Sequence, residues 1–472
     1  MIPLTGTYND LYQLTMAQVY FLRGKQSEQA VFDYFFRKLP FGGGYAVFAG
    51  LEDVLDVLEN LHFSGEDIRY LEQQGLHPGF LEYLEGFRFR GDIFSSREGD
   101  LVFPYRPVLR VEAGIIEAQV IETLLLNFLN FQTLVATKAR RMRQVAGTER
   151  RLVDFGLRRA HGYGGYLASR AAMIGGFDAT SNVQAGRDYR IPVSGTMAHS
   201  FIESYDSELD AFRDFARERP DDCVLLVDTY DTLKSGVPHA ITVGKEMEKD
   251  GKRLKGIRLD SGDLTYLSIR ARKMLDEAGL DYVKIAASNQ LDEEVIKSIL
   301  DEGAAIDLFG VGTSLVTGQP DAALDGVYKL SKANDKPRLK LSESLEKISF
   351  PHRKQVYRLL LNDHFYGGDV VALAEEELPL EMMHHPFDPL KSMPIDCYRL
   401  EPLLEPVMRS GRRVNEKLRV EEIRNYSQQR FNNLPEAFKR FKNPHVYKIG
   451  LSDRLNEERN RLIESKRKGD PT

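Results

Sequence analysis

The sequence predicts an α/β protein with a (β/α) barrel and a second, smaller α+β domain. Between residues 150 and 330, short apolar runs alternate with helical patterns, and strands begin near Val224, Ile257, Val283 and Ile306. This regular alternation is typical of βα units around a parallel sheet. A doubly wound sheet has the same alternation. Polar residues follow several of the strands, which favours a barrel, because barrels carry their sites at that end.

The predicted barrel elements follow one another in a regular order. Strands are expected at 223–228, 256–260, 282–287 and 305–309, with helices after the first three that end near residues 249, 278 and 301. Polar or glycine residues follow these apolar runs. Because the carboxyl ends of parallel strands meet at one mouth, we expect these residues to lie close together.

The remainder of the chain indicates a smaller α+β domain. A strand is expected at 31–36 and a helix at about 49–61. The longest helix is expected from about residue 115 to residue 144, where apolar residues recur at helical spacing, and it connects the two domains. The predicted domains are a discontinuous small domain at 1–112 and about 335–415, a barrel at 113–334, and a helical C-terminal extension at 416–472 that frays from residue 465.

Composition excludes several classes of protein. The 472 residues include 42% hydrophobic and 28% charged side chains, and the formal net charge is −6. Without a basic excess, the chain is not expected to bind nucleic acid. No apolar run of about 18 residues and no signal-peptide pattern occur, so no membrane span or signal peptide is expected. Two cysteines, Cys223 and Cys397, are too few for a four-cysteine zinc site and indicate the reducing cytoplasm.

Gly310, Gly312 and Thr313 belong to a turn, GVGTS at 310–314, that follows an apolar run. Glycines let backbone N–H groups approach an anion, and the hydroxyl groups add donors. A helix that begins after the turn adds a favourable dipole. The late position of the turn in the barrel favours a phosphate ligand, although the same residues also suit an ordinary βα turn.

Arg258 and Asp260 lie in RLDSGD at 258–263 and point to the same side of a strand. Arginine suits a carboxylate or a phosphate, and aspartate suits a ribose hydroxyl or a hydrated Mg²⁺ ion. Ser261 can cap the helix that follows. The alternative is a buried ion pair that holds the barrel together.

An aromatic residue and arginines occur together in DFGLRR at 154–159. Phe155 offers a ring face, and Arg158 a charged plane, to a heteroaromatic ligand. The alternative is a core phenylalanine beside two solvated arginines.

Two further segments each contain one candidate site residue. In GTMAHS at 195–200, His199 suits a base or a nucleophile that accepts a phosphoryl group, or else a structural histidine. In NDLYQLT at 9–15, Tyr12 taken alone is an exposed residue of an N-terminal helix.

These segments occur together and in one order, and they resemble the nicotinate phosphoribosyltransferase family. The resembling stretches are NDLYQLT, FDYFFRKLPFGGGYAVFAGL, NFQTLVATKARR, DFGLRRAHG, SGTMAHS, RLDSGDL and GVGTSLVTG. The resemblance runs from about residue 4 to about residue 330 and continues weakly beyond it. It implies an irregular (β/α) barrel beside a small α+β sandwich domain, and an active site at the interface of a homodimer.

The resemblance also implies which residues hold nicotinate. Tyr12, contributed by the other subunit, would stack on the ring opposite Phe155. Thr196 and Arg258 would hold nicotinate, with Arg258 as the counter-ion of its carboxylate. Arg158 would lie near the ring and the phosphates.

The remaining implied roles concern phosphate and catalysis. Gly310, Gly312 and Thr313 would hold the 5-phosphate of the phosphoribosyl group, and Arg37 would reach pyrophosphate across the dimer. His199 resembles the histidine that ATP phosphorylates, and Asp260 is a second candidate catalytic residue.

The implied activity is the ATP-dependent formation of nicotinate mononucleotide and pyrophosphate from nicotinate and 5-phosphoribosyl 1-pyrophosphate, the first step of NAD synthesis from nicotinic acid. Mg²⁺ accompanies pyrophosphate and ATP. The ring nitrogen attacks the anomeric carbon through a transition state that resembles an oxocarbenium ion. Positioning and charge stabilisation then carry the step.

Single residues distinguish nicotinate transfer from the alternative functions. Relatives that use nicotinamide carry an aspartate where this chain has Ser181, which favours nicotinate. His199 argues against a quinolinate transferase, which resembles the family in fold but lacks ATP coupling. His199 also argues against a barrel that only senses phosphoribosyl ligands. An unrelated barrel aldolase or isomerase needs a catalytic lysine or acid pair, and Lys284 is the one obvious strand lysine.

Overall fold

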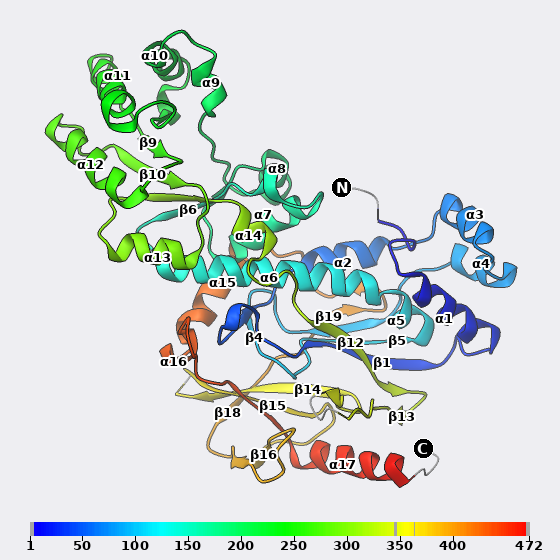
Figure 1. Ribbon diagram of the computed structural model, residues 1–472. Helices are drawn as coiled ribbons and strands as arrows, with labels where there is room; N and C mark the ends of the chain where they lie inside the picture. The colour runs from blue at the N-terminus through cyan, green and yellow to red at the C-terminus, as the bar shows by residue number, and fades with distance from the viewer. Residues whose placement is uncertain (1–3, 344–346, 363, 469–472) are drawn as a thin grey trace. The chain divides into compact units, whose positions relative to one another are not determined.

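Two compact units make up the chain (Figure 1). The computed structural model describes residues 4–343, 347–362 and 364–468. Residues 135–322 form one unit, here called the barrel unit. Residues 1–134 and 323–472 form the other, here called the two-segment unit because both ends of the chain contribute to it.

The barrel unit is built around a six-stranded sheet in which every pairing is parallel. Its strands are β6 (Arg151–Asp154), β7 (Ala179–Thr180), β8 (Val224–Leu226), β9 (Gly256–Leu259), β10 (Lys284–Ser288) and β11 (Leu308–Val311). Their order is β7-β6-β11-β10-β9-β8, so the first strand along the chain pairs with the last, as a closing barrel requires. A parallel bridge from Thr180 to Val193 extends the sheet beyond β7. Among the described residues no ladder joins β7 to β8, and the fold is the irregular (β/α) barrel that the sequence predicts.

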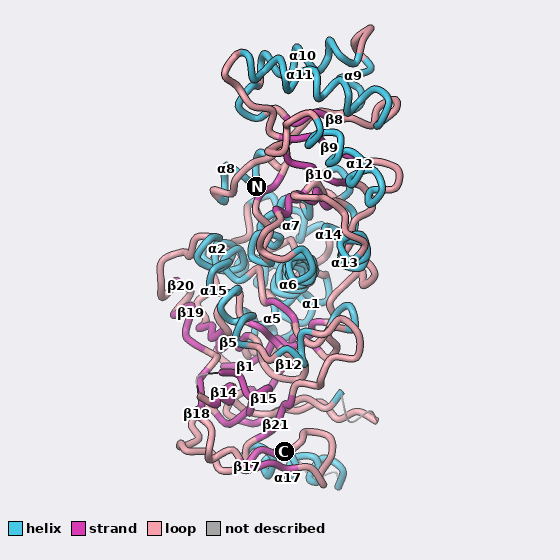
Figure 2. The backbone as a smooth tube through the Cα atoms, turned by 90° about the vertical axis from the view of Figure 1, so that its left-hand side faces the viewer, coloured by secondary structure: helices cyan, strands magenta, loops and turns pink. Residues whose placement is uncertain are grey.

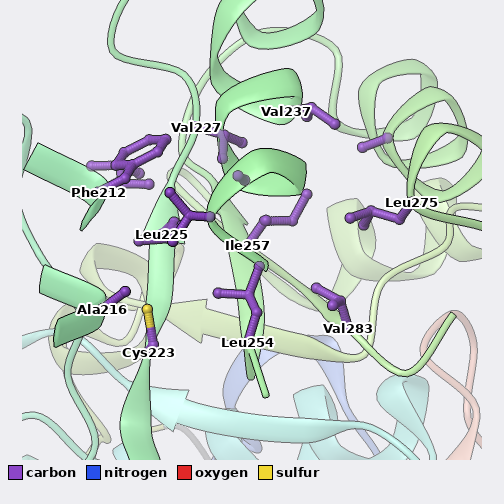
Figure 3. Close-up of a cluster of buried hydrophobic side chains, with 14 of the residues drawn as sticks. Phe212, Ala216, Cys223, Leu225, Val227, Val237, Leu254, Ile257, Leu275 and Val283 are labelled. Atoms are coloured by element: carbon purple, nitrogen blue, oxygen red, sulfur yellow. The ribbon is translucent and has the colours of Figure 1, made fainter. Parts of the chain in front are cut away.

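Helices surround this sheet, as the tube drawing shows (Figure 2). They are α7 (Gly164–Gly175), α8 (Val183–Tyr189), α9 (His199–Glu203), α10 (Glu208–Glu218), α11 (Val237–Lys249), α12 (Leu264–Glu277), α13 (Glu293–Asp301) and α14 (Thr313–Thr317). Phe212 of α10, Leu225 of β8, Ile257 of β9 and Leu275 of α12 belong to one buried apolar cluster (Figure 3). Removal of this apolar surface from water holds helices on strands and fixes the strand ends where the polar residues lie.

The two-segment unit is α+β, with two large sheets. The first has the order β13-β12-β1-β5-β3-β19-β20 and the second β17-β16-β21-β15-β14-β18. The strands are β1 (Gln29–Phe36), β2 (Ala46–Val47), β3 (Asp92–Ser95), β4 (Leu101–Val102), β5 (Leu109–Gly114), β12 (Gly326–Ala333), β13 (Lys336–Pro337), β14 (Lys354–Leu361), β15 (His364–Leu373), β16 (Met382–His384), β17 (Ser392–Pro394), β18 (Arg399–Pro402), β19 (Glu405–Arg409), β20 (Arg412–Arg413) and β21 (Lys448–Leu451). The helices are α1 (Leu11–Leu22), α2 (Leu51–Asn60), α3 (Gly65–Gln73), α4 (Pro78–Glu85), α5 (Ile115–Val120), α6 (Glu122–Ala146), α15 (Val420–Asn433), α16 (Glu436–Lys439) and α17 (Asp453–Lys468).

Several local expectations differ from the structure. The predicted long helix is divided into α5 and α6 at Ile121, and α6 begins in one unit and ends in the other. The last barrel strand begins at Leu308 rather than residue 305, because its register is set by pairing with β6 and β10. The segment 416–472, expected to be helical, also contains β21, which pairs with β15. Helix α17 continues through residues 465–468, so fraying does not begin there, and residues 469–472 lie outside the described part.

A cluster of buried charges lies inside the two-segment unit. Asp100 accepts hydrogen bonds from Arg358 Nη1 (2.9 Å) and Arg430 Nε (2.7 Å). Asp369 forms ion pairs with Arg106 (2.7 Å) and Arg358 (3.1 Å). Apart from Arg430, whose side chain is 9% exposed, the side chains of this cluster are at most 1% exposed. These pairs link segments of the chain that lie far apart in sequence.

Candidate active site

The carboxyl ends of β6, β9, β10 and β11 contribute to a cavity of about 550 Å³ in the barrel unit. The predicted residues that line it are Phe155, Arg158, Arg258, Asp260, Gly310, Gly312 and Thr313. These residues come from three separate sequence motifs, and the barrel brings them to one mouth, as the strand pattern predicts.

Arg258 is the most constrained side chain of this cavity. It is 12% exposed and has five N–H donors. Nε donates to Ser288 Oγ (2.9 Å), Nη1 donates to Thr196 Oγ1 (2.8 Å) and the Met197 carbonyl (3.2 Å), and Nη2 donates to Asp260 Oδ1 (3.0 Å). The described residues therefore occupy four of the five donors, and among them no acceptor faces the second N–H of Nη2, which remains for a ligand.

Asp260 is held from several sides. Its Oδ1 accepts from Arg258 and from Ser288, and its Oδ2 lies 3.8 Å from His199 Nε2. Burial alone would raise the pKa of Asp260. The Ser288 hydrogen bond and the Arg258 charge outweigh this effect and hold its pKa below the ordinary value. Asp260 is thus an ionised carboxylate with one oxygen directed at the histidine.

Asp228 supports the same region from the end of β8. Its Oδ2 accepts from the backbone N–H of Asp260 (2.7 Å) and from Ser261 Oγ (2.7 Å). The expectation that Ser261 caps the following helix is wrong, because its hydroxyl is used here. Asp263 is the residue that caps α12, by accepting from the N–H of Tyr266 (3.0 Å).

The turn that carries Phe155 is anchored by Asp154. This carboxylate is 1% exposed and accepts from the Gly156 N–H, Ser169 Oγ and Thr180 Oγ1, each at 2.8 Å. Burial raises the pKa of Asp154, because these neutral donors offset only part of the cost of removing the charge from water. The anchored turn directs the Phe155 ring into the cavity, where the Arg258 guanidinium lies 5.6 Å from the ring centroid.

Gly310 has a second role that sequence reasoning does not assign. A Cβ atom at Gly310 would overlap the ring of Phe155, so the glycine makes room for the ring. A Cβ at Gly312 would meet no atom closer than 3.4 Å, the carbonyl oxygen of Phe155. Thr313 is exposed and begins α14 directly after Gly312.

His199 begins α9 and is half-buried, with 38% of its side chain exposed. Its Nδ1 lies 3.0 Å from Thr229 Oγ1, and its Nε2 lies near Asp260. One ring nitrogen is thus oriented by a hydroxyl, and the other faces the carboxylate at the cavity.

Tyr12 and Arg37 belong to the two-segment unit, so the described barrel cavity is formed without them. Tyr12 is 52% exposed on α1, and Arg37 has a buried Nε with no hydrogen-bond partner among the described residues. Sequence reasoning missed Ser288, Thr229 and Asp228. The acid at 228 directly follows an apolar strand, a signal that could have identified it.

A barrel mouth that gathers arginines, glycines and an aromatic ring defines a barrel protein for an anionic, ring-containing ligand. Models of the nicotinate phosphoribosyltransferase N-terminal domain, family and C-terminal domain match residues 7–130, 150–365 and 353–459. The chain therefore belongs to the nicotinate phosphoribosyltransferase family.

Individual relatives agree over nearly the full length. The chain is 44% identical to a nicotinate phosphoribosyltransferase of Bacillus subtilis, covering 97% of this chain and 96% of the relative. It is 37% identical to nicotinate phosphoribosyltransferase 1 of Arabidopsis thaliana, covering 96% and 92%. The crystal structure of human nicotinic acid phosphoribosyltransferase matches with a TM-score of 0.86 at 31% identity, covering 96% of this chain and 99% of that one. Within the described residues, no helix has the length and apolar character needed to cross a bilayer.

Proposed function

We propose that the chain forms nicotinate mononucleotide and pyrophosphate from nicotinate and 5-phosphoribosyl 1-pyrophosphate, with ATP consumed through a phosphohistidine at His199. The observation that carries this proposal is the arrangement of Arg258 and Asp260, which joins an aromatic ring site at Phe155 to the histidine.

Nicotinate fits beside Phe155, with its carboxylate toward Arg258 and Thr196. The free N–H of Arg258 supplies one donor. The Thr196 hydroxyl supplies a second, because its present bond to the Met197 carbonyl is long, at 3.4 Å. Two donors on one carboxylate explain a preference for the acid over the amide. A Tyr12 side chain from a second copy then covers the other face of the ring.

The phosphoribosyl group fits the glycine side of the mouth. Backbone N–H groups near Gly312 and the exposed Thr313 hydroxyl are suited to its 5-phosphate, with Gly310 lining the same wall. Arg158 lines the same cavity, and its charge is suited to a phosphate group. Mg²⁺ enters with pyrophosphate and ATP as part of these substrates, and Arg37 of a second copy approaches the pyrophosphate.

His199 accepts the γ-phosphoryl group of ATP in this proposal. A nitrogen–phosphorus bond forms as the bond from phosphorus to the ADP oxygen breaks, and water later cleaves the new bond to release phosphate. Thr229 and Asp260 hold the ring in place for this transfer. The phosphorylated ring then adds negative charge beside the pyrophosphate site.

A homodimer is part of the same proposal. Helix α1 exposes apolar side chains, namely Leu11, Tyr12, Val19 and Leu22. Such a surface suits a second copy, which would supply Tyr12 to the ring site. The two cysteines are unpaired, which supports a cytoplasmic location.

We expect purified protein with Mg²⁺ and phosphoribosyl pyrophosphate to release pyrophosphate with nicotinate, and ATP to increase the rate. His199→Ala is expected to abolish the ATP-dependent increase, because the phosphoryl acceptor is lost. His62→Ala, an exposed histidine of the two-segment unit, serves as the matched control. An unchanged ATP response in His199→Ala would contradict the phosphohistidine, and turnover of nicotinamide in place of nicotinate would contradict the interpretation of Ser181.

Gly310→Ala is expected to lower kcat/KM for nicotinate by about 5- to 30-fold, because the added methyl displaces the Phe155 ring at an overpacking cost of about 1–2 kcal/mol. Steady-state kinetics with varied nicotinate measure this effect. Gly86→Ala is the control, since a Cβ there meets no atom closer than 3.8 Å. Equal effects of the two substitutions would show that the ring of Phe155 does not depend on Gly310.

A further inference from the structure

Ser288 joins the two charged residues of the site. It ends β10, and the residue is 3% exposed. Its Oγ accepts a hydrogen bond from Arg258 Nε (2.9 Å) and donates one to Asp260 Oδ1. Because Arg258 Nη2 also donates to Asp260 Oδ1 (3.0 Å), the three side chains form a closed ring of hydrogen bonds.

This ring of hydrogen bonds determines which atoms of Asp260 and Arg258 remain available to a ligand or to His199. Oδ1 of Asp260 is used twice within the ring, which leaves Oδ2 toward His199 Nε2 at 3.8 Å. Nε of Arg258 is used by Ser288, so the guanidinium plane cannot turn without breaking a buried hydrogen bond. The direction of the free N–H of Arg258 Nη2 is thereby fixed, and so is the guanidinium face that lies over the Phe155 ring.

An aliphatic residue of the same size would remove both constraints. Arg258 Nε would lose its acceptor in a place that water reaches poorly, and Asp260 Oδ1 would lose a donor. Arg258 and Asp260 would still attract each other, because they are two residues apart at the end of β9, but their mutual orientation would no longer be unique.

We propose that Ser288 is a positioning residue that locks Arg258 and Asp260 into one unit, so that the guanidinium is aligned for the carboxylate of nicotinate and the free carboxylate oxygen is aligned for His199. This inference rests on the proposed function of the same site. Ser288 touches no substrate in it, and it acts only through the two charged residues.

Ser288→Ala is expected to lower kcat/KM for nicotinate about tenfold, the effect of one buried hydrogen bond to a charged group. KM for phosphoribosyl pyrophosphate is expected to change less than about twofold, because the glycine wall is untouched. Ser288→Thr retains the hydroxyl and is expected to recover most of the activity. Ser268→Ala is the control: Ser268 is another fully buried serine of the barrel unit, whose Oγ accepts from the Ala305 N–H (3.2 Å) and donates to the Thr265 carbonyl (3.0 Å), not to a residue of this ring.

A double-mutant cycle separates positioning from general structural damage. In an Asp260→Ala background, Ser288→Ala is expected to lower kcat/KM by only about threefold, because one of its two hydrogen-bond partners is already gone and Arg258 alone remains. A full tenfold loss in that background, or a Ser288→Ala variant within twofold of the wild type, would overturn the inference. Melting curves of all variants show whether each is folded. Failure of the wild-type protein to turn over nicotinate would instead refute the proposed function itself.

Discussion

Arg258→Gln is expected to lower kcat/KM for nicotinate by about 10²- to 10³-fold, the largest kinetic effect among the residues of the cavity. Two losses add up. The carboxylate of nicotinate loses its cation, and Asp260 is left half-buried without the charge that pairs with it. Truncating one partner of a hydrogen-bonded charge pair costs about 2–5 kcal/mol, which covers this range of rates.

Arg258→Lys is the informative comparison for this prediction. Lysine keeps the positive charge but cannot serve Ser288, Thr196 and Asp260 at once, because it has no planar fork of donors. We expect an intermediate loss, smaller than that of the glutamine variant. Steady-state kinetics with varied nicotinate, together with melting curves, measure both. Equal activity of Arg258→Gln and the wild type would show that Arg258 does not bind nicotinate.

Nicotinamide adds a test of charge recognition. A neutral ring gains little from the Arg258 cation, so Arg258→Gln is expected to reduce the preference for nicotinate over nicotinamide. An unchanged ratio of the two rates would indicate that other groups, such as Arg158, recognise the carboxylate.

The mouth of the barrel could be predicted because its residues follow strands. Arg258 lies on β9, and Asp260 directly follows this strand. Gly310 lies near the end of β11, and Phe155 directly follows β6. Parallel βα units place such positions at one edge, so the alternation of apolar runs was sufficient. The pairing of the first strand with the last, β6 with β11, depends on the closing of the barrel and is visible only in the structure.

Individual hydrogen bonds between residues that are distant in sequence could not be predicted from the sequence. Thr196 and Arg258 are 62 residues apart, and their hydrogen bond needs the chain to bring the segment before α9 next to β9. Ser288 and Thr229 belong to no motif, and each is one hydroxyl among many. The sequence indicates that the backbone at Gly310 can approach an anion, whereas the contact of Gly310 with the Phe155 ring depends on the position of another strand end.

The buried charges of the two-segment unit were missed for the same reason. Asp100 and Arg358 are 258 residues apart, in segments that carry no shared pattern. Sequence periodicity reports which side chains are buried on one element, and it does not report which distant charge neutralises them.

Asp100→Ala is expected to lower the free energy of unfolding by about 3–5 kcal/mol, the usual cost of breaking a buried ion pair by removal of one partner. The substitution leaves Arg358 fully buried without one of its two carboxylates and leaves Arg430 with Glu401 alone. Urea unfolding followed by circular dichroism measures this loss. Asp335→Ala is the control, because its ion pair with Lys332 has a 95% exposed carboxylate and should contribute nothing measurable.

The free energy of unfolding should depend on pH at acid pH, because the pKa of Asp100 in this cluster differs between the folded and unfolded states. Burial alone would raise this pKa, but Arg358 and Arg430 lower it from 3.8 to about 2. A carboxyl whose folded pKa lies below its unfolded value contributes stability that is complete above the unfolded pKa and is lost as the pH falls toward the folded pKa. The difference in pKa corresponds to about 2.5 kcal/mol. Because part of this energy remains at the folded pKa, the stability gap between the wild type and Asp100→Ala should narrow by about 2 kcal/mol between pH 5 and pH 2. A gap that stays constant over this range would show that the carboxylate contributes by shape and not by charge.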